Sequence, residues 1–199
     1  MANPATGTSG FSLSTLRALG HGEFRFDGTD DYINVSQLGH FTWHAVPFTL
    51  AAWVLDDTNI GAGFSHRFIS WYDGTNNIQL GLTTDIAATS TKRIIYVVNA
   101  AVTAQPQAIS AGDLATGWHH VAATYDGLSS YKVYIDGSLS VGDPATVGVN
   151  IGVQLTDTTN LFFGQRGDSA GWTLGMMDDM RLYGVELSAA EILLISQGQ

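Results

Sequence analysis

The amino-acid sequence predicts an all-β protein, an antiparallel β-sandwich with a short C-terminal helix. About ten short runs are rich in β-branched and aromatic residues, and several alternate apolar with polar side chains, which is the period of a half-buried strand. Asp-Gly pairs fall between these runs, and such pairs accept the positive φ angles that tight turns need. With 199 residues and no Cys, the chain is expected to form one domain around one core, without disulfides.

The expected strands begin at residue 22 and continue to residue 183. Their short length and the turn residues between them favour hairpins and an antiparallel sandwich. The runs are Gly22–Asp27, Tyr32–Ser36, Phe48–Asp56, Arg67–Tyr72, Asn77–Thr83, Lys92–Asn99, Trp118–Asp126, Tyr131–Asp136, Asn160–Gly164 and Thr173–Tyr183, with Asp-Gly pairs at 27–28, 73–74, 126–127 and 136–137.

The run Trp118–Tyr125 shows how the two faces of a strand are expected to differ. Its small alanine side chains indicate that another layer packs closely against it. Trp53 and Trp118 are both expected in the core. Alternation places Val121, Ala123 and Tyr125 on one face and His120, Ala122 and Thr124 on the other.

The two ends of the chain differ from the strand pattern. Ser188 and Glu191 form a capping box before an apolar stretch, which predicts a short C-terminal helix. Residues 1–21 are polar and Gly-rich around one apolar patch, and they predict an N-terminal arm that contacts a neighbouring subunit. No targeting segment is expected, and residues 22–199 are expected to form the domain proper.

Charge excludes some classes of partner. Eight basic against 18 acidic side chains give a net charge of −10, which argues against nucleic-acid binding and against anionic membranes. No segment predicts membrane insertion. Only 13% of the residues are charged, so much of the surface must be neutral and suited to contact with other molecules.

Four segments, in this order, are similar to one family. They are Phe26–Tyr32, Phe48–Val54, Gly117–Gly127, and Asp178–Tyr183 with the following Leu187–Ile192. Together they resemble the laminin-G-like branch of the concanavalin A-like lectin/glucanase superfamily over residues 22–197. The resemblance implies a jelly roll of two curved antiparallel sheets. It also implies a non-catalytic module that binds glycans or proteins and often holds a calcium ion.

The enzymes of that superfamily hydrolyse β-glucans with two carboxylates about 5 Å apart on one strand face. The glutamates here are Glu23, Glu186 and Glu191, and none is paired at such a spacing. Adjacent histidines such as His119 and His120 point to opposite faces of a strand, which argues against a zinc site. We therefore expect no enzyme, and a glucan hydrolase is the third function considered.

Calcium is the cofactor that the acidic residues suggest, because hard cations bind several carboxylate and carbonyl oxygens. Asp27, Asp30 and Asp178 are the candidate ligands, because the resemblance to this family implies that the first and last strands lie close together. The alternative is a set of solvated turn carboxylates together with a surface pair between Asp179 and Arg181.

Glycan binding would use aromatic side chains that stack on sugar faces, with polar groups nearby for the hydroxyls. The same aromatic residues also serve packing and protein contacts, so both interpretations stay open. The candidates at strand ends or loops are Trp43, His44, Trp71, Tyr72, Asn76 and Trp172.

The preferred function is a non-enzymatic, lectin-like β-sandwich displayed on a larger assembly. A phage virion surface, as a capsid decoration or tail subunit, fits the sparse charge and the apolar arm, with the chain as a homo-oligomer or particle shell protein held through residues 1–21. Binding to a cell-surface glycan is a second role. The alternative is a stand-alone extracellular lectin module that recognises a glycan or a protein.

Overall fold

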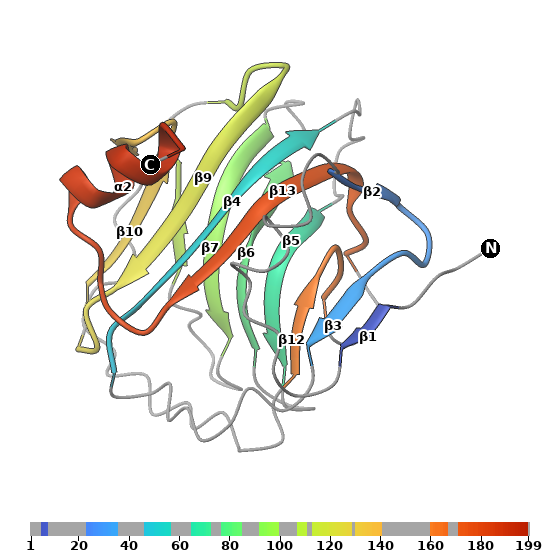
Figure 1. Ribbon diagram of the computed structural model, residues 1–199, viewed down its shortest axis with the longest axis horizontal. Helices are drawn as coiled ribbons and strands as arrows, with labels where there is room; N and C mark the ends of the chain where they lie inside the picture. The colour runs from blue at the N-terminus through green and yellow to red at the C-terminus, as the bar shows by residue number, and fades with distance from the viewer. Residues whose placement is uncertain are drawn as a thin grey trace.

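The computed structural model describes the chain in eleven segments, and it confirms the antiparallel sandwich. In these residues thirteen strands form a six-stranded and a seven-stranded sheet, which lie face to face in Figure 1. The described residues are 5–7, 23–35, 46–56, 65–72, 77–84, 92–99, 107–110, 113–128, 130–140, 160–166 and 171–198.

The six-stranded sheet has the order β11-β10-β9-β4-β13-β2, and all its neighbours are antiparallel. Its two longest strands, β4 and β13, lie side by side near the middle, so the sheet joins segments far apart in the sequence. In chain order the strands are β2 (Phe24–Asp27), β4 (Phe48–Asp56), β9 (Trp118–Tyr125), β10 (Tyr131–Ile135), β11 (Ser138–Ser140) and β13 (Leu174–Tyr183).

The seven-stranded sheet has the order β1-β3-β12-β5-β6-β7-β8. All its pairs are antiparallel except that β1 runs parallel to β3 at one edge. The ten predicted strands are confirmed, whereas the three-residue strands β1, β8 and β11 were not predicted. The strands are β1 (Ala5–Gly7), β3 (Ile33–Val35), β5 (Ser65–Tyr72), β6 (Asn77–Thr84), β7 (Lys92–Asn99), β8 (Gln107–Ile109) and β12 (Asn160–Phe163).

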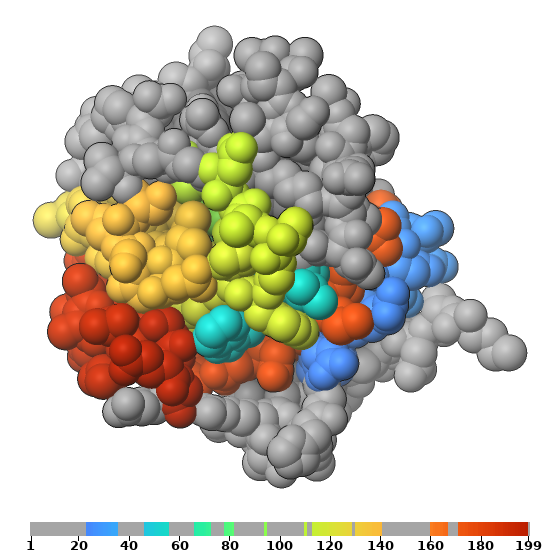
Figure 2. Space-filling view, turned by 90° about the horizontal axis from the view of Figure 1, so that it is seen from above, coloured from blue at the N-terminus to red at the C-terminus, as the bar shows by residue number. Residues whose placement is uncertain are grey.

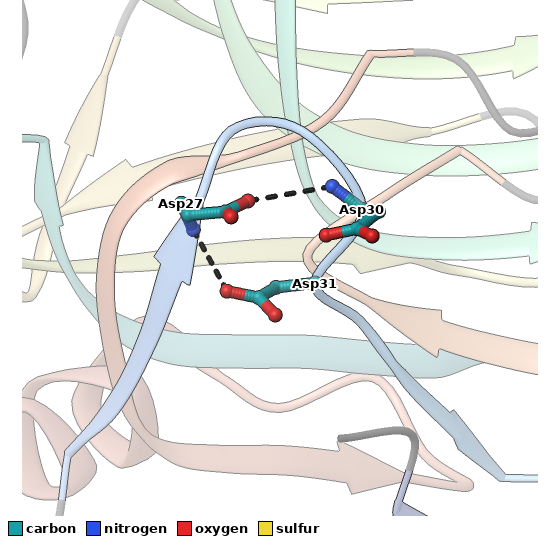
Figure 3. Close-up of side chains that lie close together, drawn as sticks. All are labelled: Asp27, Asp30 and Asp31. Carbon is teal, nitrogen blue, oxygen red and sulfur yellow. Dashed lines mark hydrogen bonds between the residues drawn. The ribbon is translucent and has the colours of Figure 1, made fainter. Parts of the chain in front are cut away.

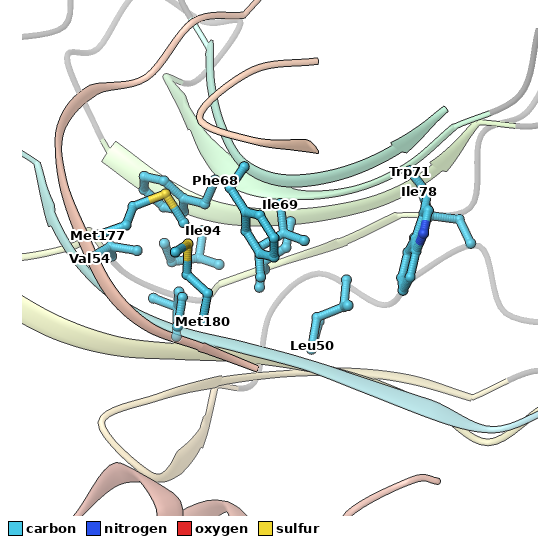
Figure 4. Packing of buried hydrophobic residues seen from close by; sticks show 14 of the residues in the cluster. Leu50, Val54, Phe68, Ile69, Trp71, Ile78, Ile94, Met177 and Met180 are labelled. Atoms are coloured by element: carbon cyan, nitrogen blue, oxygen red, sulfur yellow. The ribbon is translucent and has the colours of Figure 1, made fainter. Parts of the chain in front are cut away.

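The core lies between the sheets and takes mostly alternate residues from the longer strands, with exceptions at the β-bulges of β5 and β13 (Figure 4). From β4 it receives Phe48, Leu50 and Val54, and from β5 it receives Ile69 and Trp71. Phe48 and Trp71 meet edge to face with ring centroids 5.9 Å apart. Full burial of one large apolar side chain stabilises the fold by about 1.5–3 kcal/mol, so this layer supplies most of the driving force.

Helix α2 (Ala189–Ser196) packs on the outer face of the six-stranded sheet. Its Ile192 and Ile195 lie against the small side chains Ala51 and Ala122, which confirms the second layer that the alanines predicted. Ser188 caps the helix reciprocally with Glu191, as predicted. Within the described segments no helix is long and apolar enough to cross a membrane.

The Asp-Gly pairs have different roles. Gly127 and Gly137 have φ of 81° and 77° in the tight turns that join β9 to β10 and β10 to β11, which confirms those two predictions. Gly28 also has a positive φ, of 78°, but its turn joins β2 in one sheet to β3 in the other. The predicted turn is therefore confirmed there, although it connects the two sheets and does not form a hairpin, and the pair at 73–74 lies outside the described residues.

Candidate functional site

The predicted ligand-binding aromatics separate into different environments. Trp43, His44 and Asn76 lie outside the described residues. Trp71 is fully buried in the core, so the prediction that it offers a stacking surface is wrong. Trp71 pairs with Ile78 of β6, and paired residues lie on the same face of a sheet. Both side chains point into the core, so the Trp71 indole faces inward.

Trp172 and Tyr32 remain half-buried, and a ligand can approach their exposed parts. Tyr32 lies 6.0 Å from Trp172 and 6.1 Å from Phe162, measured between ring centroids. We call these three residues the aromatic rim. It combines the connection between β2 and β3, strand β12, and the segment before β13. Tyr72, the remaining predicted candidate, is half-buried at the end of β5.

Polar side chains continue from the rim across the outer face of the seven-stranded sheet. The register aligns Asn34 of β3, Phe162 of β12, Ser70 of β5 and Gln79 of β6 in one row. Of the described residues, Asn34 Oδ1 and Ser70 Oγ are buried without a hydrogen-bond partner. A buried polar group left unpaired is costly, so both atoms suit an ordered water, and Ser70 itself is fully buried.

Gly81 of β6 leaves room for the Arg67 side chain on this face of the sheet. The Arg67 Nε–H donates to Gln79 Oε1 in the row. A Cβ at Gly81 would collide with the carbonyl oxygen of His66 and would lie 3.1 Å from Arg67 Cδ. Glycine at position 81 therefore lets the Arg67 side chain cross strand β6.

An acidic turn follows β2 and precedes Tyr32 of the aromatic rim (Figure 3). We define it by Asp27, Asp30 and Asp31, whose nearest ligand oxygens all lie within 4.8 Å of one another. Asp27 Oδ1 accepts hydrogen bonds from the N–H groups of Thr29 (2.8 Å) and Asp30 (3.3 Å). Asp31 Oδ2 accepts one from the Asp27 N–H at 3.0 Å. These bonds hold the turn in shape.

The acidic turn fits part of a calcium site but not the ligand set that was predicted. Calcium takes six to eight oxygens, and the carboxylates keep lone pairs beyond their backbone bonds. The carboxylate of Asp31 lies with those of Asp27 and Asp30, whereas the carboxylate of Asp178 is not part of this group. Leu174 lies opposite Asp27, so Asp178 is four residues further along β13, roughly 13 Å away.

Both tryptophans that were expected in the core project from the outer face of the six-stranded sheet. Trp118 is 38% exposed, and Trp53 is half-buried with its ring 5.7 Å from that of His120. His119 and His120 face opposite sides of β9, as expected; His119 Nδ1 lies 2.7 Å from Asp136 Oδ2.

His120 is the residue of this outer face whose pKa is most altered, and it is only 2% exposed. Burial first, and then the positive charge of Arg181, lower its pKa from 6.5 to about 4, although Asp179 and Asp136 oppose the shift. Arg181 makes two hydrogen bonds to Asp179, at 2.8 and 2.6 Å, which confirms the pair considered from the sequence. At neutral pH, His120 is therefore an uncharged ring beside a charged pair.

The glutamates have structural environments. Glu186 Oε1 accepts a hydrogen bond from Lys132 Nζ at 2.7 Å, and Glu191 caps α2. Glu23 is exposed before β2. A pair of carboxylates spanning a sugar bond, as glycosidases need, is not formed by these three residues.

The sequence did not single out Tyr32, Asn34 or Phe162. A signal was present for the first two, because Ile33 and Val35 turn towards the core and alternation then sends their neighbours outward. Phe162 had no such signal, since it lies in a run of apolar residues that reads as buried on both faces.

Comparison with protein families identifies the family of this chain. The family model described as the concanavalin A-like lectin/glucanases superfamily, of laminin-G type, matches residues 27–193. A search of the curated proteins found no match to this sequence.

Solved structures with the same fold include clostridial neurotoxin binding domains. The botulinum neurotoxin serotype G binding domain is 16% identical, with a TM-score of 0.65 over 90% of this chain and 43% of that one. The serotype D domain in complex with N-acetylneuraminic acid is 17% identical, with a TM-score of 0.61 over 89% and 42%. The neurotoxin DC domain in complex with rat synaptotagmin II is 12% identical, with a TM-score of 0.65 over 88% and 42%. The chain thus spans less than half the length of these proteins, and the likeness shows the fold.

Proposed function

Because the chain belongs to the concanavalin A-like lectin/glucanase superfamily, we propose that it is a non-enzymatic binding module that recognises a glycan at the aromatic rim. The observation that carries this proposal is the position of Tyr32 and Trp172. Both rings are half-exposed, and they lie between the acidic turn and a row of polar side chains. Two structural neighbours were solved with N-acetylneuraminic acid and with synaptotagmin II, so the fold serves glycan and protein ligands elsewhere.

The chemistry of the rim suits a sugar. The C–H face of a pyranose packs against an indole or phenol ring, and its hydroxyls need directional partners nearby. Carboxylates of the acidic turn and the amide of Asn34 supply such partners. Three carboxylates would repel an acidic sugar, so we propose a neutral glycan, with Ca²⁺ at Asp27, Asp30 and Asp31 holding the turn.

Absence of catalysis is part of the proposal, and two features support it. Glu186 and Glu191 are bonded to Lys132 and Ser188, where they stabilise the fold. The carboxylates of the acidic turn accept backbone hydrogen bonds in an exposed turn, whereas a catalytic acid is typically kept protonated by an apolar pocket.

The test is a neutral glycan array followed by calorimetry on the best binder. Loss of a stacked ring costs about 1–3 kcal/mol, so Trp172→Ala should weaken binding by about fivefold or more. Leu128→Ala is the matched control, because Leu128 is exposed in the turn between β9 and β10. Equal glycan affinity of Trp172→Ala and wild type would exclude the aromatic rim as the glycan-binding site.

Display on a larger assembly, such as a virion surface, is the second candidate function. Leu139, Leu193 and Leu194 are exposed on β11 and α2, two elements in contact, and such side chains suit a subunit interface. Strand β1 of the N-terminal arm pairs with β3 of its own chain at the edge of a sheet, and an arm exchanged between subunits would make the same pairing with a neighbour. Light scattering on the full chain and on a chain lacking residues 1–20 tests this, since an equal mass for both would contradict an assembly role for the arm.

A further inference from the structure

We propose that the outer face of the six-stranded sheet carries a second site for neutral glycans, centred on Trp118 and Trp53. This proposal rests on the proposed function, which is glycan recognition. The site lies on the six-stranded sheet, whereas the aromatic rim lies on the seven-stranded sheet. We call the site the outer-face patch. It consists of Trp53, Leu55, Trp118, His120, Met176, Asp179 and Arg181.

Strand register brings the aromatic and aliphatic part of the patch together. Leu55 of β4 lies opposite Trp118 of β9 on one side and opposite Met176 of β13 on the other. Trp53 is in the next row on the same face, opposite His120. Three adjacent strands place the outer members of a row about 10 Å apart, which is wide enough to seat a pyranose ring.

Helix α2 leaves these rows uncovered. It packs over the row that contains Ala51 and Ala122, one row away from Trp53 and His120. Figure 2 shows parts of β9 in yellow-green, β4 in cyan and β13 in orange at the surface between α2 and β2. Trp118 is 38% exposed there, so an apolar ligand face can reach its ring.

A β-bulge in β13 adds polar groups to the same face. The register shifts between Asp178 and Arg181, and Asp179 has φ of +47°, in the left-handed region that non-glycine residues rarely adopt. This bulge sends both Asp179 and Arg181 outward, where they pair. Arg181 also donates to Tyr183, so two of its five N–H donors stay available within the described structure.

His120 supplies a further polar atom beside the Trp53 indole. The ring is 2% exposed and meets Trp53 edge to face. Its buried Nδ1 has no hydrogen-bond partner among the residues described. An ordered water at this atom would satisfy it and would link it to a sugar hydroxyl when the ligand rests on the patch.

Charge selects a neutral ligand. Arg25 and Arg181 face Asp178, Asp179 and Asp136 here, so the face carries a small excess of negative charge, as does the whole chain with its net charge of −10. This charge repels an acidic sugar, and the few cations offer little attraction to a strongly charged partner, so a neutral glycan fits best.

The experiment measures binding of short neutral gluco-, galacto- and manno-oligosaccharides by array and calorimetry. It compares wild type with Trp118→Ala, Trp172→Ala and the control Leu128→Ala. We expect at least one oligosaccharide whose affinity falls tenfold or more in Trp118→Ala and stays within twofold in the other two variants. Trp118→Phe should recover most of that loss, because it restores an aromatic face at the same position.

The outcomes separate the two proposals. Binding that depends on Trp172 alone would overturn the outer-face patch and keep the proposed function. Absence of binding to every oligosaccharide would overturn both. A change of solution mass in Trp118→Ala, without any change in glycan affinity, would show that the face is a contact between protein chains and would overturn the proposal as well.

Discussion

His120 makes stability depend on pH in a direction that the structure defines. The unfolded chain binds a proton at this histidine below its ordinary pKa of 6.5, whereas the folded protein binds it only near pH 4. Burial of the ring beside Arg181 is the cause. The neutral ring therefore contributes stability that is fully present above pH 6.5 and is lost as the pH falls towards 4.

The size of the effect follows from the shift. A change from 6.5 to about 4 corresponds to about 3 kcal/mol of unfolding free energy over that pH range. Carboxylates also titrate there, so the absolute stability of wild type does not isolate His120. His120→Gln removes its titration, and the stability gap between wild type and variant should shrink by about 3 kcal/mol between about pH 7 and about pH 4.

Urea unfolding followed by tryptophan fluorescence, at several pH values, measures that gap. His119→Gln is the matched control, because it removes the adjacent histidine on the opposite face of β9 and leaves His120 in place. An NMR titration of the His120 ring gives the folded pKa directly. A folded pKa near 6.5, or a gap that stays constant with pH, would refute the reasoning.

Three further outcomes are expected. Trp71→Ala should lower the free energy of unfolding by about 3–5 kcal/mol in urea melts, and a loss below 1 kcal/mol would contradict its place in the core. Ser188→Ala should cost about 1 kcal/mol by loss of the cap of α2, while Ser188→Gly should cost less in the same melts; equal costs would argue against capping. Adding Ca²⁺ should raise the melting temperature of wild type and of Asp178→Asn but not of Asp30→Asn, and a wild-type curve insensitive to EDTA would exclude the calcium proposal.

Local chemistry accounts for most of the fold that the sequence predicted. The capping box at Ser188 and Glu191 and the glycines of two hairpins depend on neighbouring residues alone, and all were confirmed. The small side chain of Ala122 also signalled a close layer, which is α2.

The site was harder to predict because it depends on which face of a strand meets the core. Trp71 and Trp118 have the same side chain at the end of a strand, yet one is fully buried and the other is 38% exposed. Sequence alternation relates the residues of one strand to one another but does not say which set points inward. Asp178 was misplaced for a related reason, because the register between β2 and β13 depends on pairing across most of the chain.

The position of β13 between β4 and β2 has a consequence for synthesis of the protein. β4 ends at residue 56 and β13 begins at residue 174, so more than half of the chain is made before the two can pair. Contacts of such sequence separation close slowly, because a long loop must lose its freedom first. Until then one edge of β4 stays open, and an open edge of apolar residues is a template for pairing with other chains. We therefore expect the nascent chain, rather than the finished sandwich, to be the form most prone to aggregation.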